Sequence, residues 1–423
     1  MNTTAKFDYA MIPSGKTFTV RLMLALEGDQ QSDKNRTPLN ISLALDRSGS
    51  MGGAKLRNVK AATQLLVENL SKDDIFSLTI FDNTVRPLVY PVSIKDAHDI
   101  EWSINAIRSG GSTFLSGGYE EACRLAGKNL SERYVTRVML LTDGLANMGV
   151  VEPVELAARA ASMQQKGITT TTIGVGLDYD ESLLSSMAEF GGGGSYTIEN
   201  PGDAVSVFQE ELGFLKSLSA TDCQVRFVPA VHGITFAQLN SFPISSQGSL
   251  LLGDIYEGRR KSLVLEIELP PLEEEAEKNI GYFEISYRDA TFGNKEEHLR
   301  LNVAIDAVSS GEFAGTQAER DVTLEACFLI VARAKAESIK LADAGQFEQA
   351  AALLEMHVEA LRGIGIQDTA LDLEFLDLKR RAQDLRAGGD RFYTSFERKR
   401  MHHESNMMLK SCMSSYRAMK ERR

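Results

Sequence analysis

Long apolar runs, paired cysteines and a surplus of basic residues are all missing from this chain of 423 residues. A membrane-spanning helix needs about 18 or more consecutive apolar residues, and no such run occurs. The 4 cysteines stand far apart and form no CxxC, which favours reduced thiols over a disulfide framework. The formal net charge of -12 argues against a general nucleic-acid-binding surface. The first residues, MNTTAKFDYAMIPSG, also lack the apolar core of a secretory signal, so we expect a cytoplasmic protein with no membrane span.

The signatures of common enzyme classes are missing as well. The chain contains no Walker A sequence, no GxSxG nucleophile elbow and no protein-kinase signature. Its 6 histidines are scattered along the chain and show no HExxH spacing. We therefore expect a protein that is not an enzyme.

The pattern of apolar residues divides the chain into four parts. Residues 1–36 alternate with period two, as in KTFTVRLMLALEG, and predict strands. Residues 37–217 alternate strand and helix signals, which predicts a doubly wound α/β domain with a mostly parallel sheet. Residues 218–308 return to strand patterns without helical spacing, which is typical of a β-sandwich. Residues 309–423 are helical and end in a basic tail.

The first 36 residues have too few strands for a sheet of their own, because a two-stranded piece is marginal in water. We expect them to pair with the strands of 218–308. The predicted fold class is thus an α/β doubly wound, Rossmann-like domain inserted in a β-sandwich, followed by a C-terminal α-helical region. Within the α/β part, the run Gly191–Gly194 reads as the exit of a helix.

The tail from residue 391 carries nine Lys or Arg and three Glu, a surplus of six positive charges on an otherwise acidic chain. Such a segment either folds back onto the acidic body or binds an acidic partner or an anionic surface. The sequence leaves both readings open.

Oxygen-bearing side chains follow three of the predicted strands. DRSGSMGG begins with Asp46, Ser48 and Ser50 directly after the apolar run LNISLAL. Asp143 follows the run VMLL, and Thr113 lies in the glycine-rich segment RSGGSTFLSGG. The carboxyl ends of parallel strands meet at one edge of a doubly wound sheet, so these side chains should converge there.

Two carboxylates and three hydroxyls suit a hard cation. Mg²⁺ prefers oxygen ligands in octahedral geometry and keeps several waters, while Zn²⁺ prefers His and Cys, which this set lacks. The sequence therefore predicts a metal site made of Asp46, Ser48, Ser50, Thr113 and Asp143, with Mg²⁺ as the cofactor and Ca²⁺ or Mn²⁺ as possible substitutes.

The set DRSGS, GGSTFL and LLTDG resembles the metal-ion-dependent adhesion site (MIDAS) of the von Willebrand factor A (VWA) family. The order of strands, α/β part, further strands and helices resembles bacterial intracellular proteins of that family. The resemblance implies that Ser48, Ser50 and Thr113 reach the metal through hydroxyls, and that Asp46 and Asp143 bind it directly or through water. It further implies a Mg²⁺-dependent protein-interaction module whose partner supplies an Asp or Glu carboxylate. The partner's identity and the oligomeric state stay open.

Several alternatives remain at this point. Asp46 and the serines could simply cap the following helix, or the metal could serve only to hold three loops together. LLTDGLAN also resembles the VWA-bearing subunit of magnesium chelatase, which suggests an accessory subunit of an AAA+ ATPase-type complex. A metal-dependent hydrolase would need a general base beside the metal, and none is evident. A secreted adhesin conflicts with the missing signal and the unpaired cysteines.

Overall fold

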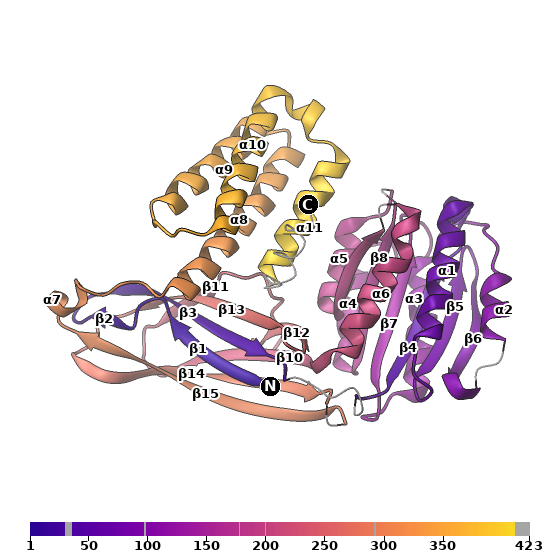
Figure 1. Cartoon of the computed structure of the whole chain (residues 1–423), viewed down its shortest axis with the longest axis horizontal. Coiled ribbons are helices and arrows are strands. Elements are labelled where there is room, and N and C mark those ends of the chain that lie inside the picture. The colour runs from indigo at the N-terminus through magenta and orange to yellow at the C-terminus, as the bar shows by residue number, and fades with distance from the viewer. Residues whose placement is uncertain (30–35, 97–98, 177, 199, 292, 411–423) are drawn as a thin grey trace.

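The computed structural model describes residues 1–29, 36–96, 99–176, 178–198, 200–291 and 293–410, and it contains three units (Figure 1). An α/β unit lies on one side, two packed sheets lie beside its lower end, and a helical region lies above those sheets. No helix in the described ranges is long and apolar enough to cross a membrane.

The α/β unit is built on a six-stranded sheet with the order β6-β5-β4-β7-β8-β9. The strands are β4 (Leu39–Asp46), β5 (Ile75–Phe81), β6 (Val85–Ser93), β7 (Val135–Thr142), β8 (Ile168–Val175) and β9 (Gly192–Ile198). All neighbours are parallel except β5 and β6. The four strands β4, β5, β7 and β8 are buried along their whole length. This burial matches the apolar runs of β4, β5 and β7, whereas β8, ITTTTIGV, buries four threonines.

Helices cover both faces of this sheet, as the alternating pattern predicted. Along the chain they are α1 (Ala54–Glu68), α2 (Ile100–Asn105), α3 (Leu115–Ala126), α4 (Pro153–Gln165), α5 (Glu181–Phe190) and α6 (Ala204–Lys216). One hydrophobic core joins α1, α2 and α6 to the sheet, and a second joins α3, α4 and α5 to its other face.

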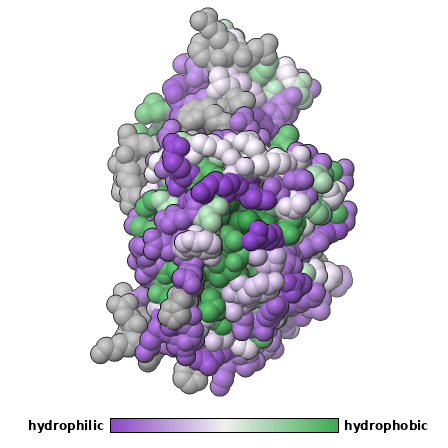
Figure 2. Space-filling view, turned by 90° about the vertical axis from the view of Figure 1, so that its right-hand side faces the viewer, coloured by the Kyte–Doolittle hydropathy of each residue, from purple (hydrophilic) through white to green (hydrophobic). Residues whose placement is uncertain are grey.

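The antiparallel strand β6 is absent from the sequence-based assignment. It forms one edge of the sheet, and Figure 2 shows the molecule from this side, with hydrophobic residues among hydrophilic ones. Its sequence, VRPLVYPVS, contains Pro87 and Pro91, which hide a strand pattern because proline donates no ladder hydrogen bond. Edge strands tolerate proline, and β6 is such a strand.

The run Gly191–Gly194 is a second difference, because Gly192 begins strand β9 rather than extending a helix exit. A Cβ atom on Gly193 would lie 2.3 Å from the backbone oxygen of Thr170 in β8. The glycines therefore allow β9 to approach its neighbour closely, which is a packing requirement.

Nine strands form two further sheets. The first has the order β1-β3-β13-β11 and the second β12-β10-β14-β15-β2. Their bounds are β1 (Asn2–Phe7), β2 (Met11–Pro13), β3 (Phe18–Glu27), β10 (Leu218–Pro229), β11 (Thr235–Gln238), β12 (Leu250–Tyr256), β13 (Arg260–Leu269), β14 (Glu275–Asp289) and β15 (Lys295–Val308). One hydrophobic core contains residues of both sheets, among them Leu22, Leu263 and Phe283.

The N-terminal strands pair with the later strands, as expected from their number. β3 pairs with β13 over ten residue pairs, from Phe18↔Leu269 to Glu27↔Arg260, and β2 pairs with β15. The α/β unit lies in the chain between β3 and β10.

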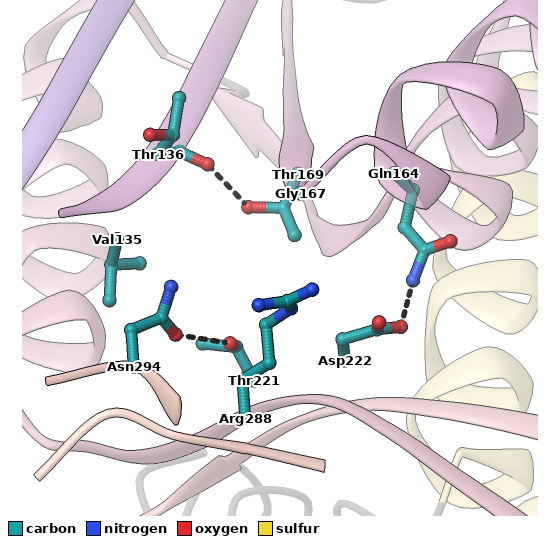
Figure 3. Close-up of a pocket in the computed structure, with 9 residues that line it drawn as sticks. All are labelled: Val135, Thr136, Gln164, Gly167, Thr169, Thr221, Asp222, Arg288 and Asn294. Atoms are coloured by element: carbon teal, nitrogen blue, oxygen red, sulfur yellow. Dashed lines mark hydrogen bonds between the residues drawn. The ribbon is translucent and has the colours of Figure 1, made fainter. Parts of the chain in front are cut away.

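Polar contacts join the α/β unit to the second sheet. Arg137 of β7 is buried and forms an ion pair with Asp254 of β12. Figure 3 shows the narrow pocket beside this junction, where Gln164 of α4 faces Asp222 of β10 and donates a hydrogen bond to its carboxylate. Because the paired groups come from both units, this junction fixes the lower end of the α/β unit against the sheets.

The helical region contains α8 (Arg320–Asp343), α9 (Phe347–Arg362), α10 (Thr369–Phe392) and α11 (Ser395–Leu409), after the short α7 (Ser310–Phe313). The backbone of α10 is not helical at Gly388. Apolar residues of α8 share a core with Met23 of β3 and Val264 of β13, so the region rests on the first sheet.

Part of the basic tail folds back onto the body. Helix α11 lies between the other helices and the α/β unit (Figure 1), where Arg398 and Lys399 pair with Glu181 of α5. The rest of the tail, residues 411–423 with Cys412, lies outside the described residues. The other three cysteines, Cys123, Cys223 and Cys327, are buried and unpaired.

Candidate functional site

The predicted site lies at the edge of the six-stranded sheet where β4 and β7 end. These two strands are neighbours, so Asp46, the last residue of β4, comes close to Asp143, which directly follows β7. After Asp46 the chain makes a short 3-10 turn, Gly49–Met51, and enters α1 at Ala54 through Gly53, which has a φ of 78°. The turn that the sequence suggested is therefore present.

Asp46 is fully buried and both of its carboxylate oxygens accept hydrogen bonds. The backbone N–H of Ser48 donates to Oδ1 at 2.7 Å, and the hydroxyl of Thr142 donates to Oδ2 at 2.5 Å. Burial raises the pKa of the Asp46 carboxyl above its ordinary value, although these hydrogen bonds oppose the shift. A positive charge close to this buried carboxyl would stabilise its ionised form.

A chain of hydroxyls connects the first loop to Asp143. The Oγ atoms of Ser48 and Ser50 lie 3.1 Å apart, and Ser50 donates to Asp143 Oδ1 at 2.7 Å. Asp143 is also fully buried. Ser48 and Ser50 thus lie between the two carboxylates, and their side chains do not cap α1.

Thr113 completes the set from the loop before α3. It is buried, with 4% of its surface exposed, and its backbone N–H donates to Asn147 Oδ1 at 3.0 Å. Gly49 N–H also donates to the carbonyl of Gly111 at 3.1 Å, so the first and second loops are tied together.

Gly144 lies beside the hydroxyl groups of both Thr113 and Ser50. A Cβ atom on Gly144 would lie 3.2 Å from Thr113 Oγ1 and 4.0 Å from Ser50 Oγ. Both hydroxyls therefore border the small space beside the Gly144 backbone, and the three loops meet there. All five predicted residues are found at this one edge.

Three contributors were missing from the sequence-based set. Thr142 bonds to Asp46, Gly144 leaves room for the hydroxyls, and Lys55 of α1 places its ammonium nitrogen 2.5 Å from Asp143 Oδ2. Position in the motif could have revealed Thr142 and Gly144, since they flank Asp143. Lys55 gives no such signal, because a basic residue in the first turn of a helix is usually a solvated one.

The donor set fits a hard divalent cation. Every candidate ligand is a carboxylate or hydroxyl oxygen, which matches Mg²⁺ chemistry and not that of soft metals. No group of three or more His, Cys, Asp or Glu that could hold a metal occurs in the described part of the chain. A metal at this edge would therefore depend on the hydroxyls of Ser48, Ser50 and Thr113.

A mostly parallel α/β domain with an oxygen-lined edge is the class that the fold and the site define. Within it, residues 40–210 match the family model of the von Willebrand factor type A domain, so the chain carries a domain of this kind. The matched range covers the six-stranded sheet except Leu39, and all three loops of the site.

The similarity to known proteins extends beyond this domain. The chain is similar to the crystal structure of the ArnB paralog VWA2 from Sulfolobus acidocaldarius, with a TM-score of 0.63, 18% identity, and coverage of 96% of this chain and 97% of that one. An uncharacterized protein of Synechocystis, sll0103, is 26% identical over 64% of this chain and 67% of its own length. The uncharacterized protein YfbK of Escherichia coli is 26% identical over 53% of this chain, but the match spans only 40% of YfbK.

Proposed function

We propose that this chain is a non-enzymatic, Mg²⁺-dependent protein-interaction module. It binds an Asp or Glu carboxylate of a partner protein at a complete MIDAS formed by Asp46, Ser48, Ser50, Thr113 and Asp143. The observation that carries the proposal is the hydrogen-bonded series from Asp46 through Ser48 and Ser50 to Asp143. That series joins two buried carboxylates inside a VWA domain, through the backbone N–H of Ser48 and then the neutral hydroxyls of Ser48 and Ser50.

Hydroxyls suit this role because they bind a cation without cancelling its charge. The hydroxyls of Ser48, Ser50 and Thr113 would bind Mg²⁺, with Asp46 and Asp143 bound directly or through water. Ca²⁺ or Mn²⁺ could substitute for Mg²⁺. The bound ion would supply the largest local charge of the site and attract an anionic oxygen. The protein holds the loops in place through Asn147, Gly111 and Thr142.

The other units would position this edge. We infer that residues 1–36 and 218–308 form one β-sandwich, that residues 37–217 are a VWA domain inserted in it, and that residues 309–423 form a helical region. The extensive pairing of β3 with β13 supports this division. A cytoplasmic home, as in bacterial intracellular VWA proteins, fits the burial and free state of Cys123, Cys223 and Cys327.

Two other functions need observations of their own. An accessory role in an AAA+ ATPase-type complex would use the same site with an ATPase as the partner. A metal-dependent hydrolase would need a general base beside the metal, and the ionisable neighbour of Asp143 is instead the ammonium group of Lys55. The interaction module is therefore the function that the geometry supports best.

The test compares Asp46→Asn with Asp82→Asn. Asp82 follows β5, the strand next to β4, and its carboxylate accepts hydrogen bonds from Thr84 and pairs with Arg47, so it is a matched aspartate outside the ligand set. Calorimetric titration with MgCl₂ should show binding to the wild type and Asp82→Asn, and none to Asp46→Asn. Immobilised wild-type chain should retain partner proteins with Mg²⁺ and release them with EDTA. Retention that survives both EDTA and Asp46→Asn would refute the proposal.

A further inference from the structure

Lys55 is the charged group that approaches the candidate metal site most directly. It lies in the first turn of α1, two residues after Gly53, and its Nζ atom is 2.5 Å from Asp143 Oδ2. The Asp143 side chain is fully buried, and that of Lys55 is 23% exposed. The other oxygen of Asp143 accepts the hydroxyl of Ser50. The same carboxylate thus faces the hydroxyl set on one side and a fixed ammonium group on the other.

This contact changes the charge balance of the site. Asp46 and Asp143 contribute two negative charges, and Lys55 contributes one positive charge. The neighbouring pair of Arg47 and Asp82, 2.8 Å apart, adds no net charge. With a divalent cation bound, the site would carry a net charge of plus one, whereas without Lys55 it would be neutral.

We propose that Lys55 is a positioning residue that weakens metal binding and strengthens the capture of a carboxylate by the metal-loaded site. This inference rests on the proposed function. The ammonium group competes with the cation for Asp143, so it lowers metal affinity by direct repulsion. It also leaves an uncompensated positive charge beside the metal, and a partner carboxylate can neutralise that charge.

The two effects have opposite signs, which separates them from a structural role. If Lys55 only held the start of α1 against Asp143, its removal would loosen the site and weaken both metal binding and carboxylate capture. If Lys55 instead sets the net charge of the site, its removal strengthens metal binding and weakens carboxylate capture.

The first experiment measures binding of the metal alone. The full chain is titrated with MgCl₂ by calorimetry at low ionic strength, as the wild type, Lys55→Met, Lys55→Arg and Arg57→Met. Arg57 is an exposed residue on the same helix, so its removal takes away the same charge without touching Asp143. We expect Lys55→Met to bind Mg²⁺ at least about tenfold more tightly than the wild type. Lys55→Arg and Arg57→Met should stay within about threefold of the wild type.

The second experiment uses acetate as the carboxylate probe. Mn²⁺-loaded protein relaxes water protons, and a carboxylate that replaces a metal-bound water reduces that effect. Acetate should reduce the relaxation for wild-type protein, and Lys55→Met should require at least about fivefold more acetate for the same reduction. Thermal melting of each variant without metal reports whether the variant keeps the stability of the wild-type fold.

The outcomes of these experiments separate the two proposals. If the wild type binds neither Mg²⁺ nor Mn²⁺, the proposed function fails. If the wild type binds metal but Lys55→Met binds it equally or more weakly, the role of Lys55 is overturned while the metal site stands. The role of Lys55 would also be overturned if Lys55→Met and the wild type needed the same acetate concentration for the same reduction in water-proton relaxation.

Discussion

Arg398 of helix α11 forms an ion pair with Glu181, the first residue of helix α5. The neighbouring Lys399 lies 3.5 Å from the same carboxylate, and its ammonium group lies 4.3 Å from the centre of the Tyr179 ring. Gly176 directly follows β8, and a Cβ on it would be 3.4 Å from Nζ of Lys55. The helical region therefore contacts Tyr179 and Glu181, which lie a few residues along the chain from the glycine that borders the lysine of the candidate site.

Reversing the charge of Glu181 should weaken the docking of α11. Glu181→Lys would place a third cation beside Arg398 and Lys399, so we expect faster hydrogen exchange in residues 395–409 by about three- to tenfold. An exposed ion pair is worth about 0.2–1 kcal/mol. Here the Glu181 side chain is 10% exposed, and both of its pairs would be replaced by repulsion.

The control for this change is Glu155→Lys on α4, whose carboxylate pairs with Arg159 within its own helix. It should leave the exchange of α11 unaltered. Equal exchange in the two variants would show that these ion pairs contribute nothing to docking.

The fold was predictable where periodicity is strong and local. Buried parallel strands such as β4 and β7 show as short apolar runs, and helix α1 shows as apolar residues at helical spacing. Strand β6 was missed because Pro87 and Pro91 are acceptable only at an edge, and edge position is a property of the whole sheet. The approach of Gly193 to Thr170 likewise depends on pairing between separate segments.

The site was predictable because a topological rule brings strand ends together. Asp46 and Asp143 come from neighbouring parallel strands, so order along the chain was enough to place them at one edge. Lys55 was not predictable in this way. Its contact depends on the direction of a flexible side chain at the start of α1, and neither spacing nor composition determines that direction.

Gly144→Ala should weaken metal binding by crowding Thr113. The new methyl group would lie 3.2 Å from Thr113 Oγ1, closer than most real contacts, so the threonine has to shift by a few tenths of an ångström. We expect Mg²⁺ affinity to fall about three- to thirtyfold in a calorimetric titration, because metal sites require accurate ligand placement.

Gly110→Ala is the matched control. It lies in the loop that carries Thr113, and a Cβ there would meet no atom within 4 Å. Its Mg²⁺ affinity should equal that of the wild type. An undiminished affinity in Gly144→Ala would mean that Thr113 does not bind the metal through its hydroxyl.

Asp46 should make the stability of the metal-free protein decrease as pH rises. Burial raises the pKa of its carboxyl above the ordinary 3.8, so the folded state binds this proton more tightly than the unfolded state does. The corresponding stability is present below about pH 4 and is lost as pH rises through the pKa of the folded state. Asp46→Asn cannot titrate and should lack this component.

The measurement is urea unfolding of both proteins in EDTA between pH 4 and pH 7. The free energy of unfolding of the wild type minus that of Asp46→Asn should decrease over this range. Saturating Mg²⁺ should restore wild-type stability at pH 7, because the cation favours the ionised carboxylate. A difference that increases with pH in EDTA would contradict the assigned direction of the pKa shift.

Lys335 of α8 should be the most sensitive charged residue of the helical region. Its side chain is completely buried, with Nζ at 2.5 Å from Glu374 of α10 and 3.1 Å from Glu404 of α11. Lys335→Met would leave two buried carboxylates short of a partner, so we expect a loss of about 3–5 kcal/mol in the free energy of unfolding.

Lys340→Met, an exposed change on the same helix, is the control and should cost no more than about 0.5 kcal/mol. The double variant Lys335→Met/Glu374→Met should recover part of the loss, because packed apolar groups can replace a buried ion pair. Urea unfolding of the full chain measures all three, and a Lys335→Met cost below about 1 kcal/mol would show that Arg381, which also pairs with Glu404, suffices to neutralise the cluster.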